Sequence, residues 1–352
     1  MATSAQRGTA GSDQTPSDQD GVTPQRSRRS KGPARATGSL LHEGGSRFAV
    51  IGAWVLLIIL YGALEPNKFL TTSTFQTIFS SQQVLVFLTA ALLCTVCVGE
   101  FVDLSVASNL GLAAIVVPVL VVNHHWNVWA ASVVAIGVSL LAGVVNGWLV
   151  VALGVNTIVV TLGMSTLLLG IALWISGLTA VSGLSASFAH IALTNVAGLP
   201  LSFYYGVVLM LIFAYVLGFT PLGRYMRFVG VNREVSRLAG VRVNRIRFGS
   251  FAFAGLICGI GGVLAAAATG GFDPTVSQSY LLPVFAATFL GTAIIQPGRF
   301  NPIGTLIAIY FLATGILGLQ LFGIAGWVSD VFYGGVLIIA VTISTLLRKR
   351  VA

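Results

Sequence analysis

The sequence predicts an all-α, polytopic membrane protein of about ten transmembrane helices with broken or re-entrant segments. Composition gives the first reason. Hydrophobic residues make up 56% of the chain and charged residues 8%, and the mean hydropathy is +0.92, which lies outside the range of soluble globular proteins. The second reason is a stretch of 120 residues between Asp103 and Arg224 that contains no Asp, Glu, Lys or Arg. So long an uncharged stretch belongs in a bilayer.

Apolar runs define the individual spans. They recur from Phe48 onward with lengths of about 17 to 24 residues, close to what a helix needs to cross roughly 30 Å of hydrocarbon. The predicted spans are 48–64, 82–99, 104–122, 128–151, 156–176, 203–219, 248–269, 280–295, 302–321 and 327–347. Because Gly99–Asp103 interrupts the second and third spans, one broken helix is an open alternative there.

The chain divides into a tail and a membrane domain. Residues 1–47 are rich in Ser, Gly, Thr, Pro and Arg and lack hydrophobic periodicity, so burial cannot offset the entropy of ordering them. We therefore expect a disordered cytoplasmic tail at 1–47 and a transmembrane domain at 48–352.

Basic residues predict the orientation. Seven arginines lie in the 24 residues Arg224–Arg247, and three more basic residues lie at 348–350. Cytoplasmic loops of membrane proteins carry such an excess of Lys and Arg. Six crossings from a cytoplasmic tail would return the arginine-rich loop to the cytoplasm, and four more would return the C-terminus. Membrane orientation thus accounts for the net charge of +9. Membrane lipid is an expected partner, and no nucleic-acid partner is implied.

Glycine spacing predicts close helix packing. Gly143-x-x-x-Gly147 and Gly255-x-x-x-Gly259 lie in the fourth and seventh spans, and small residues at this spacing let helix backbones approach closely within a membrane. The uncharged segment 177–202 is rich in Gly, Ser and Ala, which favours re-entrant or interfacial pieces packed on the membrane domain.

The arginine-rich loop, 221–247, contains a short predicted helix. Asn232 is a favourable N-cap, Glu234 suits the positive first turn, and Gly240 suits the left-handed position after the last turn.

Val235, Leu238 and Ala239 fall on one apolar face of this helix. A helix of two turns is not stable alone, so this face needs a partner surface. From the residues themselves, a groove of another protein and anionic lipid headgroups are equally good partners.

Several short motifs, in order along most of the chain, carry a family resemblance. They are Asp103-Leu-Ser-Val106, Asn146-Gly147, Leu149-Val150, Thr161-Leu-Gly163, Leu222-Gly-Arg-Tyr225, the stretch Glu234–Val241 and Gly304-Thr-Leu-Ile307. With them the chain resembles the membrane permease of bacterial ATP-binding cassette importers of the ribose, xylose, arabinose and autoinducer-2 type, which is related to the branched-chain amino acid permeases.

The resemblance implies a function and partners. The chain would be the permease subunit that passes a small sugar or polyol through the bacterial plasma (inner) membrane. Its partners would be a second permease copy, a cytoplasmic ATPase dimer and an extracytoplasmic solute-binding protein. The short helix would be the coupling helix that seats in the ATPase. The predicted coupling residues are Asn232, Glu234, Val235, Arg237, Leu238, Ala239 and Gly240.

The chain itself is predicted not to be an enzyme. Its three lysines, Lys31, Lys68 and Lys349, lie outside any G-x-x-x-x-G-K-[ST] loop, which is the loop that holds ATP phosphates. The expected ATPase is therefore a separate chain. No cofactor is implied, and the three cysteines lie in apolar runs without a metal-ligand pattern.

Polar residues within the spans are candidates for two roles. They either line a polyol pathway or join helices by hydrogen bonds. The predicted pathway residues are Asn109, Asn146, Asn156, Thr157 and Thr161. Asp273 and Asp330, expected at the outer surface, either contact the binding protein or act as solvated caps.

An ion-coupled secondary transporter of a small neutral solute is the alternative function. Such transporters usually need ionisable groups near the membrane midplane. Only Glu100 and Asp103 qualify by position between the first span and the arginine-rich loop. They are either functional acids or residues of the cytoplasmic interface, where Asp103 would cap the third span.

Overall fold

The computed structural model describes the backbone of residues 39–324 and 326–351, and the side chains of residues 48–324 and 326–342. Residues 1–38 of the predicted tail lie outside this part of the chain, as do the side chains of the basic residues 348–350. The first helix begins at Ser39, inside the predicted tail, and continues through the first predicted span.

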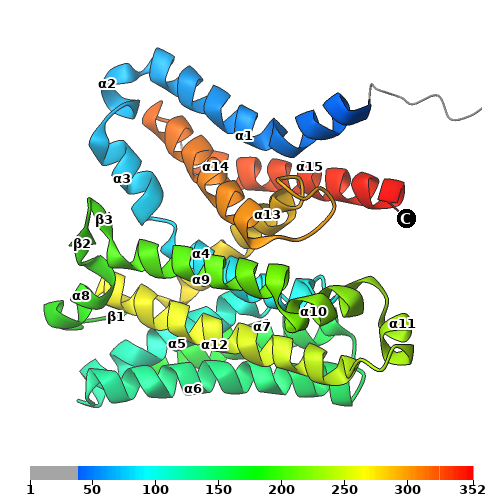
Figure 1. Ribbon diagram of the computed structural model, residues 1–352. Helices are drawn as coiled ribbons and strands as arrows, with labels where there is room; N and C mark the ends of the chain where they lie inside the picture. The colour runs from blue at the N-terminus through cyan, green and yellow to red at the C-terminus, as the bar shows by residue number, and fades with distance from the viewer. Residues whose placement is uncertain (1–38, 325, 352) are drawn as a thin grey trace, which may run out of the picture. The chain divides into compact units, whose positions relative to one another are not determined.

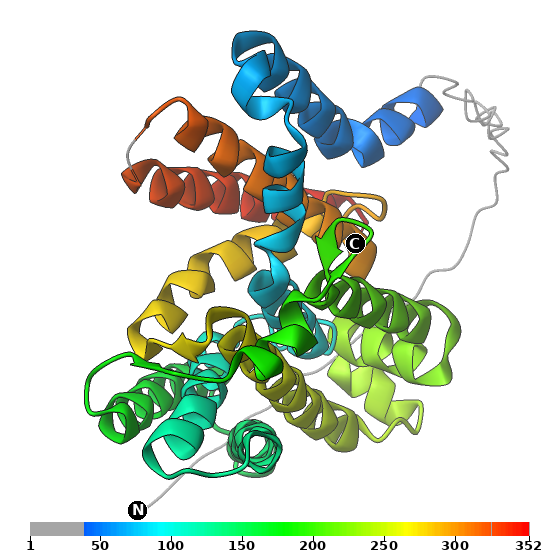
Figure 2. The ribbon, with the colours of Figure 1, turned by 90° about the vertical axis from the view of Figure 1, so that its left-hand side faces the viewer.

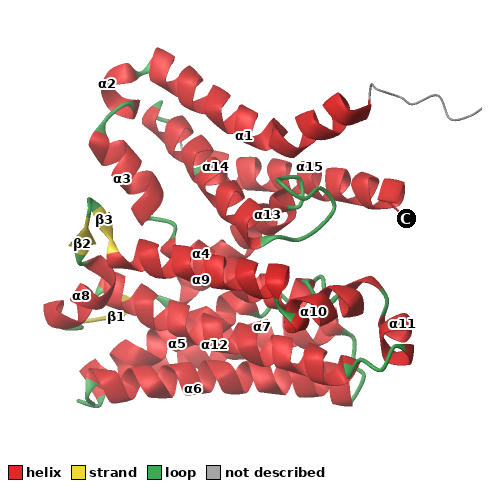
Figure 3. Ribbon diagram, in the orientation of Figure 1, coloured by secondary structure: helices red, strands yellow, loops and turns green. Residues whose placement is uncertain are grey.

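Helices dominate the described residues, and each predicted span coincides with one (Figure 3). The elements are α1 (Ser39–Leu64), α2 (Pro66–Phe69), α3 (Thr72–Ser80), α4 (Gln83–Val96), α5 (Val106–Pro118), η1 (Val119–Asn123), α6 (Val128–Gly147), η2 (Trp148–Ala152), α7 (Thr157–Ser176), β1 (Val181–Ser182), α8 (Ala186–Leu193), β2 (Asn195–Val196), β3 (Leu199–Pro200), α9 (Leu201–Phe219), α10 (Pro221–Val231), α11 (Arg233–Leu238), α12 (Val243–Thr269), β4 (Gly271–Phe272), η3 (Pro274–Tyr280), α13 (Leu281–Gly291), α14 (Pro302–Leu321) and α15 (Trp327–Val351).

Seven helical stretches among the described residues are long and apolar enough to cross a membrane. They are Thr72–Val96, Val106–Asn123, Val128–Ala152, Thr157–Ser176, Leu201–Phe219, Val243–Thr269 and Pro302–Leu321. The apolar parts of α1 and α15 are shorter, and α13 has 11 residues. The structure thus confirms the all-α polytopic class but not the count of ten spans.

The second and third predicted spans are two separate helices. α4 ends at Val96, and the chain turns at Gly99, whose φ of 84° lies in the left-handed region that favours glycine. α5 begins at Val106. The segment 65–81, between the first and second predicted spans, is largely helical, because α2 and α3 fill it and α3 leads into α4.

Glycines allow α6 and α12 to pack closely, and Figure 1 shows the two helices side by side. A Cβ atom added to Gly143 would lie 2.4 Å from the carbonyl oxygen of Phe251, and one added to Gly255 would lie 2.6 Å from that of Ser139. The two predicted small-residue motifs therefore face each other across one interface. α12 also packs against α4 and α5, which places it in the core of the described bundle.

The predicted surface segment 177–202 folds onto the membrane helices. β1 pairs antiparallel with β4, β2 pairs with β3 in a hairpin, and α8 packs on α12 while burying Phe188 and Ala192. Figure 1 places β1 and α8 at the end of the α6, α9 and α12 layer that is opposite to α10 and α11. The view from that end shows these elements in front of the helices (Figure 2).

Candidate functional site

The short helix in the arginine-rich loop forms as predicted. It is α11, with Asn232 as its N-cap. The Asn232 side-chain oxygen accepts hydrogen bonds from the backbone amides of Glu234 and Val235, at 3.0 and 3.1 Å. Gly240 follows the helix with a φ of 78°, which is the left-handed conformation expected after a helix C-terminus.

The apolar face of α11 points away from the rest of the described chain. Val235 is 60% exposed and Leu238 is 88% exposed, and Ala239 beside them is exposed. Arg237 donates a hydrogen bond to Glu234 at 3.3 Å on the same exposed helix. The residues predicted to contact a partner are thus together on one small surface, which the described residues leave uncovered.

α10 holds α11 against the turn between α4 and α5. Thr220 caps α10 by accepting a hydrogen bond from the Gly223 amide at 3.3 Å. Further along α10, a Cβ atom on Gly230 would lie 2.4 Å from the carbonyl oxygen of Cys97. Only glycine permits this approach of α10 to the chain that leaves α4.

Glu100, in that same turn, lies at the centre of a charged cluster. The side chain is 4% exposed. Its Oε1 atom accepts hydrogen bonds from Arg233 at 2.8 Å and from the Nε atom of Arg247 at 2.7 Å, and the Nη2 atom of Arg247 lies 2.6 Å away in an ion pair. Its Oε2 atom accepts one from the Thr157 hydroxyl at 2.5 Å. The cluster therefore joins the α4–α5 turn to the first residues of α11, α12 and α7.

Asp103 bonds to Ser105, the residue that precedes α5. Its Oδ1 atom accepts hydrogen bonds from the backbone amide and the hydroxyl of Ser105, at 3.1 and 2.7 Å. Burial raises the pKa of the Asp103 carboxyl, and the bonds from Ser105 oppose part of that rise. Both acids thus lie buried at the end of the bundle that carries α11.

The five predicted pathway residues do not form one cluster. Asn156 caps α7 by accepting from the Ile158 amide at 2.9 Å, Thr157 belongs to the Glu100 cluster, and Thr161 donates to the Val102 carbonyl at 3.4 Å.

Asn109 and Asn146 join helices. The Asn109 amide donates to the carbonyl of Ser139, at 3.1 Å, and the Asn146 amide donates to the hydroxyl of Ser105, at 2.8 Å. The side-chain oxygens of both asparagines are buried without a partner among the described residues. These bonds match the helix-joining alternative, and a pathway role stays a prediction.

The structure contains a second polar cluster that the sequence did not predict. The hydroxyls of Ser108 and Ser165 lie 2.8 Å apart, and the Gln278 side-chain amide donates to Ser108 at 2.6 Å. It joins α5, α7 and η3. Asn109, the neighbour of Ser108 on α5, is the only sequence signal for polar residues at this place. The sequence does not indicate that η3 packs here, because that contact depends on the tertiary fold.

The two outer acids differ. Asp273 caps η3, because its Oδ1 atom accepts hydrogen bonds from the amide and hydroxyl of Thr275, at 2.9 and 2.7 Å. These bonds lower the pKa of Asp273. Asp330 is exposed in the first turn of α15. Contact of either acid with a binding protein stays a prediction.

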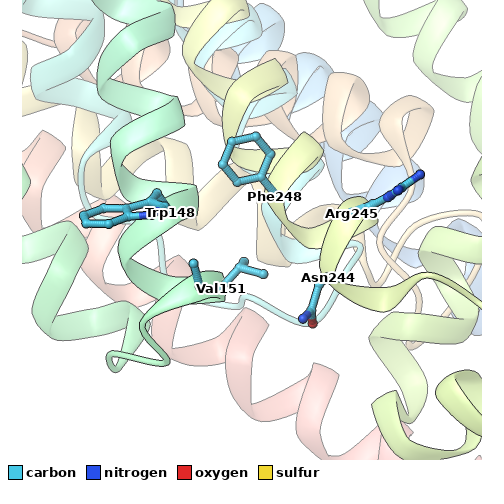
Figure 4. A pocket seen from close by; sticks show the side chains of 6 residues that line it. Trp148, Val151, Asn244, Arg245 and Phe248 are labelled. Atoms are coloured by element: carbon cyan, nitrogen blue, oxygen red, sulfur yellow. The ribbon is translucent and has the colours of Figure 1, made fainter.

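A small open pocket of about 310 Å³ lies between η2 and the start of α12. Trp148, Val151 and Ala152 line one side, and Asn244, Arg245 and Phe248 line the other. Figure 4 shows the Arg245 side chain extending away from Val151. Its walls are mostly apolar, and it shares no residue with the Glu100 cluster.

The chain is similar to a known protein family and to individual permeases. Residues 76–341 match the model of the family described as "Branched-chain amino acid transport system / permease component". The autoinducer 2 import system permease protein LsrD of Escherichia coli K12 is 29% identical over 304 residues, which cover 84% of this chain and 91% of the relative. LsrD of Shigella flexneri matches equally. No solved structure gives a significant match. Because the family model covers most of its length, the chain belongs to the family of permease components of branched-chain amino acid transport systems.

Proposed function

We propose that this permease is the membrane subunit of an ATP-driven importer for a small sugar or polyol. As a family member with seven membrane-length helices, the chain is a multi-pass protein of the inner membrane. We infer that two copies, or one copy and a related chain, pair with a cytoplasmic ATPase dimer and receive cargo from an extracytoplasmic binding protein.

The observation that carries the proposal is α11. A helix of six residues is too short to be stable alone, yet α11 is capped at both ends and its apolar face is uncovered in the described chain. Capping fixes the backbone before a partner arrives, which lowers the entropic cost of binding. A cleft in a partner protein would cover Val235 and Leu238, and the arginines around them favour an acidic rim.

A separate motor follows from the sequence. None of the three lysines lies in a loop that holds ATP phosphates, so ATP hydrolysis is assigned to the partner chain. On this assignment α10 and α11 face the cytoplasm together with both termini, and β1, α8 and η3 face outward. The arginine count near α11 supports that orientation.

The cargo class rests on two observations. The relatives are named as autoinducer 2 import permeases, and the uncharged hydroxyls and amide of Ser108, Ser165 and Gln278 form a cluster between α5, α7 and η3. Groups of this kind exchange hydrogen bonds with a hydroxylated neutral solute without an ion-coupling residue. Selection among sugars would then depend mainly on the binding protein.

Co-purification tests the proposal. The tagged full chain is expressed with its cognate ATPase, and the ATPase bound per permease is measured for wild type, Leu238→Asp and Leu178→Asp. Leu178 is a matched control, since it is also an exposed leucine, at 76%, but follows α7 at the opposite end. We expect Leu238→Asp to lose the ATPase and Leu178→Asp to retain it.

Two outcomes would reject the assignment. The first is a wild-type chain that binds no ATPase. The second is equal ATPase recovery from Leu238→Asp and wild type, which would return α11 to its other interpretation as a helix that rests on anionic lipid headgroups.

A further inference from the structure

We propose that Glu100 is a positioning residue that connects α11 to the membrane helices, so that displacement of α11 reaches α7 and α12. The inference rests on the proposed function, because it takes α11 as the segment on which the ATPase acts. It adds a specific transmission point that neither the family nor the sequence pattern assigns.

The geometry of Glu100 supports this role. Two of the four ion pairs among the described residues join parts of the chain that are far apart in sequence, and both end on this carboxylate. Arg233 lies 133 residues away and Arg247 lies 147 residues away. Arg233 also donates to the carbonyl of Gly99 at 3.0 Å, so it bonds both the Glu100 side chain and the backbone of the turn.

Arg233 is the polar side-chain link between α11 and the membrane helices within the described residues. The other side-chain bonds of α11 stay inside the helix and its cap: Asn232 bonds the amides of the first turn, Ser236 donates to the Asn232 carbonyl, and Arg237 pairs with Glu234. Displacement of α11 therefore acts on Glu100 through Arg233.

From Glu100 the hydrogen bonds continue into the bundle. Thr157, at the start of α7, donates to the second carboxylate oxygen. Three residues beyond Glu100, Asp103 accepts from the Ser105 hydroxyl, which in turn accepts from Asn146 on α6. The turn between α4 and α5 is thus bonded to three other helices, α6, α7 and α12.

The cluster is suited to transmit force. The carboxylate is 4% exposed and the Arg247 side chain is 14% exposed, so water screens these pairs weakly and charged hydrogen bonds are strong. Arg233 is 38% exposed, which leaves it free to move with α11 while Arg247 stays fixed in the bundle. A static latch that merely holds the fold together is the competing interpretation.

Hydrogen exchange separates transmission from a static latch, and it requires no knowledge of the cargo. The full chain with its ATPase is placed in lipid nanodiscs, and exchange is compared without nucleotide and after trapping with MgATP and vanadate. The variants are Arg233→Gln and Glu100→Gln. Arg245→Gln is the control, because Arg245 is an exposed arginine in the first turn of α12 and makes no ion pair among the described residues.

In wild type and Arg245→Gln, trapping is expected to change exchange over 232–241 and also over 97–105 and 157–161. In Arg233→Gln the change over 232–241 remains, because the ATPase still docks, and the changes over 97–105 and 157–161 are lost. Glu100→Gln changes no residue of α11 and should likewise abolish the changes over 97–105 and 157–161. This variant therefore controls for a structural defect of α11 in Arg233→Gln.

A static latch predicts something else, namely faster exchange over 97–105 in both states with the nucleotide-dependent difference retained. That result would overturn the proposal. Loss of ATPase binding by both variants would also overturn it, since the cluster would then serve docking and not transmission. No response over 232–241 in wild type would instead reject the proposed function.

Discussion

Replacement of Gly143 by alanine tests the packing on which the bundle depends. The added methyl would lie 2.4 Å from the carbonyl oxygen of Phe251 and 3.0 Å from the Cα atom of Gly255. Ordinary contacts of such a carbon begin near 3.4 Å, so α6 and α12 would have to separate locally by about 1 Å. α12 is the helix that begins beside α11 and carries Arg247, and separation from α6 would loosen its support.

The cost can be estimated from two opposing effects. Overpacking of a well-packed core costs about 1 to 3 kcal/mol, whereas glycine to alanine within a helix gains up to about 1 kcal/mol. We expect a net loss of about 1 to 2 kcal/mol, which corresponds to a decrease in Tm of roughly 2 to 3 °C for a domain of this size.

Thermal unfolding measured with a thiol-reactive fluorophore is a suitable assay, because Cys94, Cys97 and Cys258 are all buried. Gly170→Ala is the control. It is the same substitution within α7, where nothing lies within 4 Å of the added Cβ atom, and it should leave Tm unchanged or raise it. A Gly143→Ala protein as stable as Gly170→Ala would refute the account of this interface.

Three further predictions address capping and the outer surface. Asn232→Ala removes the cap of α11, worth about 1 kcal/mol, and should weaken ATPase binding about 5-fold in a titration; unchanged affinity would mean that α11 is ordered by the partner alone. Asn301→Ala removes the cap of α14 and the hydrogen bonds of its side-chain amide to two buried carbonyls. The loss of stability should be about 2 kcal/mol, compared with about 1 kcal/mol for Asn127→Ala, which removes an exposed cap. Equal Tm shifts of the two variants would contradict this. Asp273→Asn with Asp330→Asn should slow association of the binding protein and reduce its salt dependence, whereas an unchanged rate would leave both acids with local roles.

The spans and α11 could be predicted because their signals are local. A membrane helix can be predicted from the length and hydropathy of an apolar run, and α11 from its N-cap Asn232 and the glycine that ends it, Gly240. Close helix packing at Gly143 and at Gly255 could also be predicted from a local motif. The motif does not say which helix is the partner. The membrane-length count differs because α13 is short and because the apolar parts of α1 and α15 among the described residues are shorter than a full span.

The Glu100 cluster could not be predicted, because its two arginine partners lie more than a hundred residues away and charge alone does not pair them. The same applies to β1, whose partner β4 follows only after α12. Ser108 and Gln278 meet because η3 packs on α5, where a Cβ atom on Gly111 would lie 2.4 Å from that of Ser277. These contacts depend on tertiary packing, which periodicity does not record.

Photo-crosslinking tests the central claim, that α11 is the surface on which the ATPase acts. A photoreactive amino acid is placed at Leu238 or, as the control, at Leu178, and the full assembly is irradiated in native membranes. The account predicts a permease–ATPase adduct from position 238 and none from position 178. An adduct with lipid but not with the ATPase from position 238, or equal ATPase adducts from both positions, would contradict it.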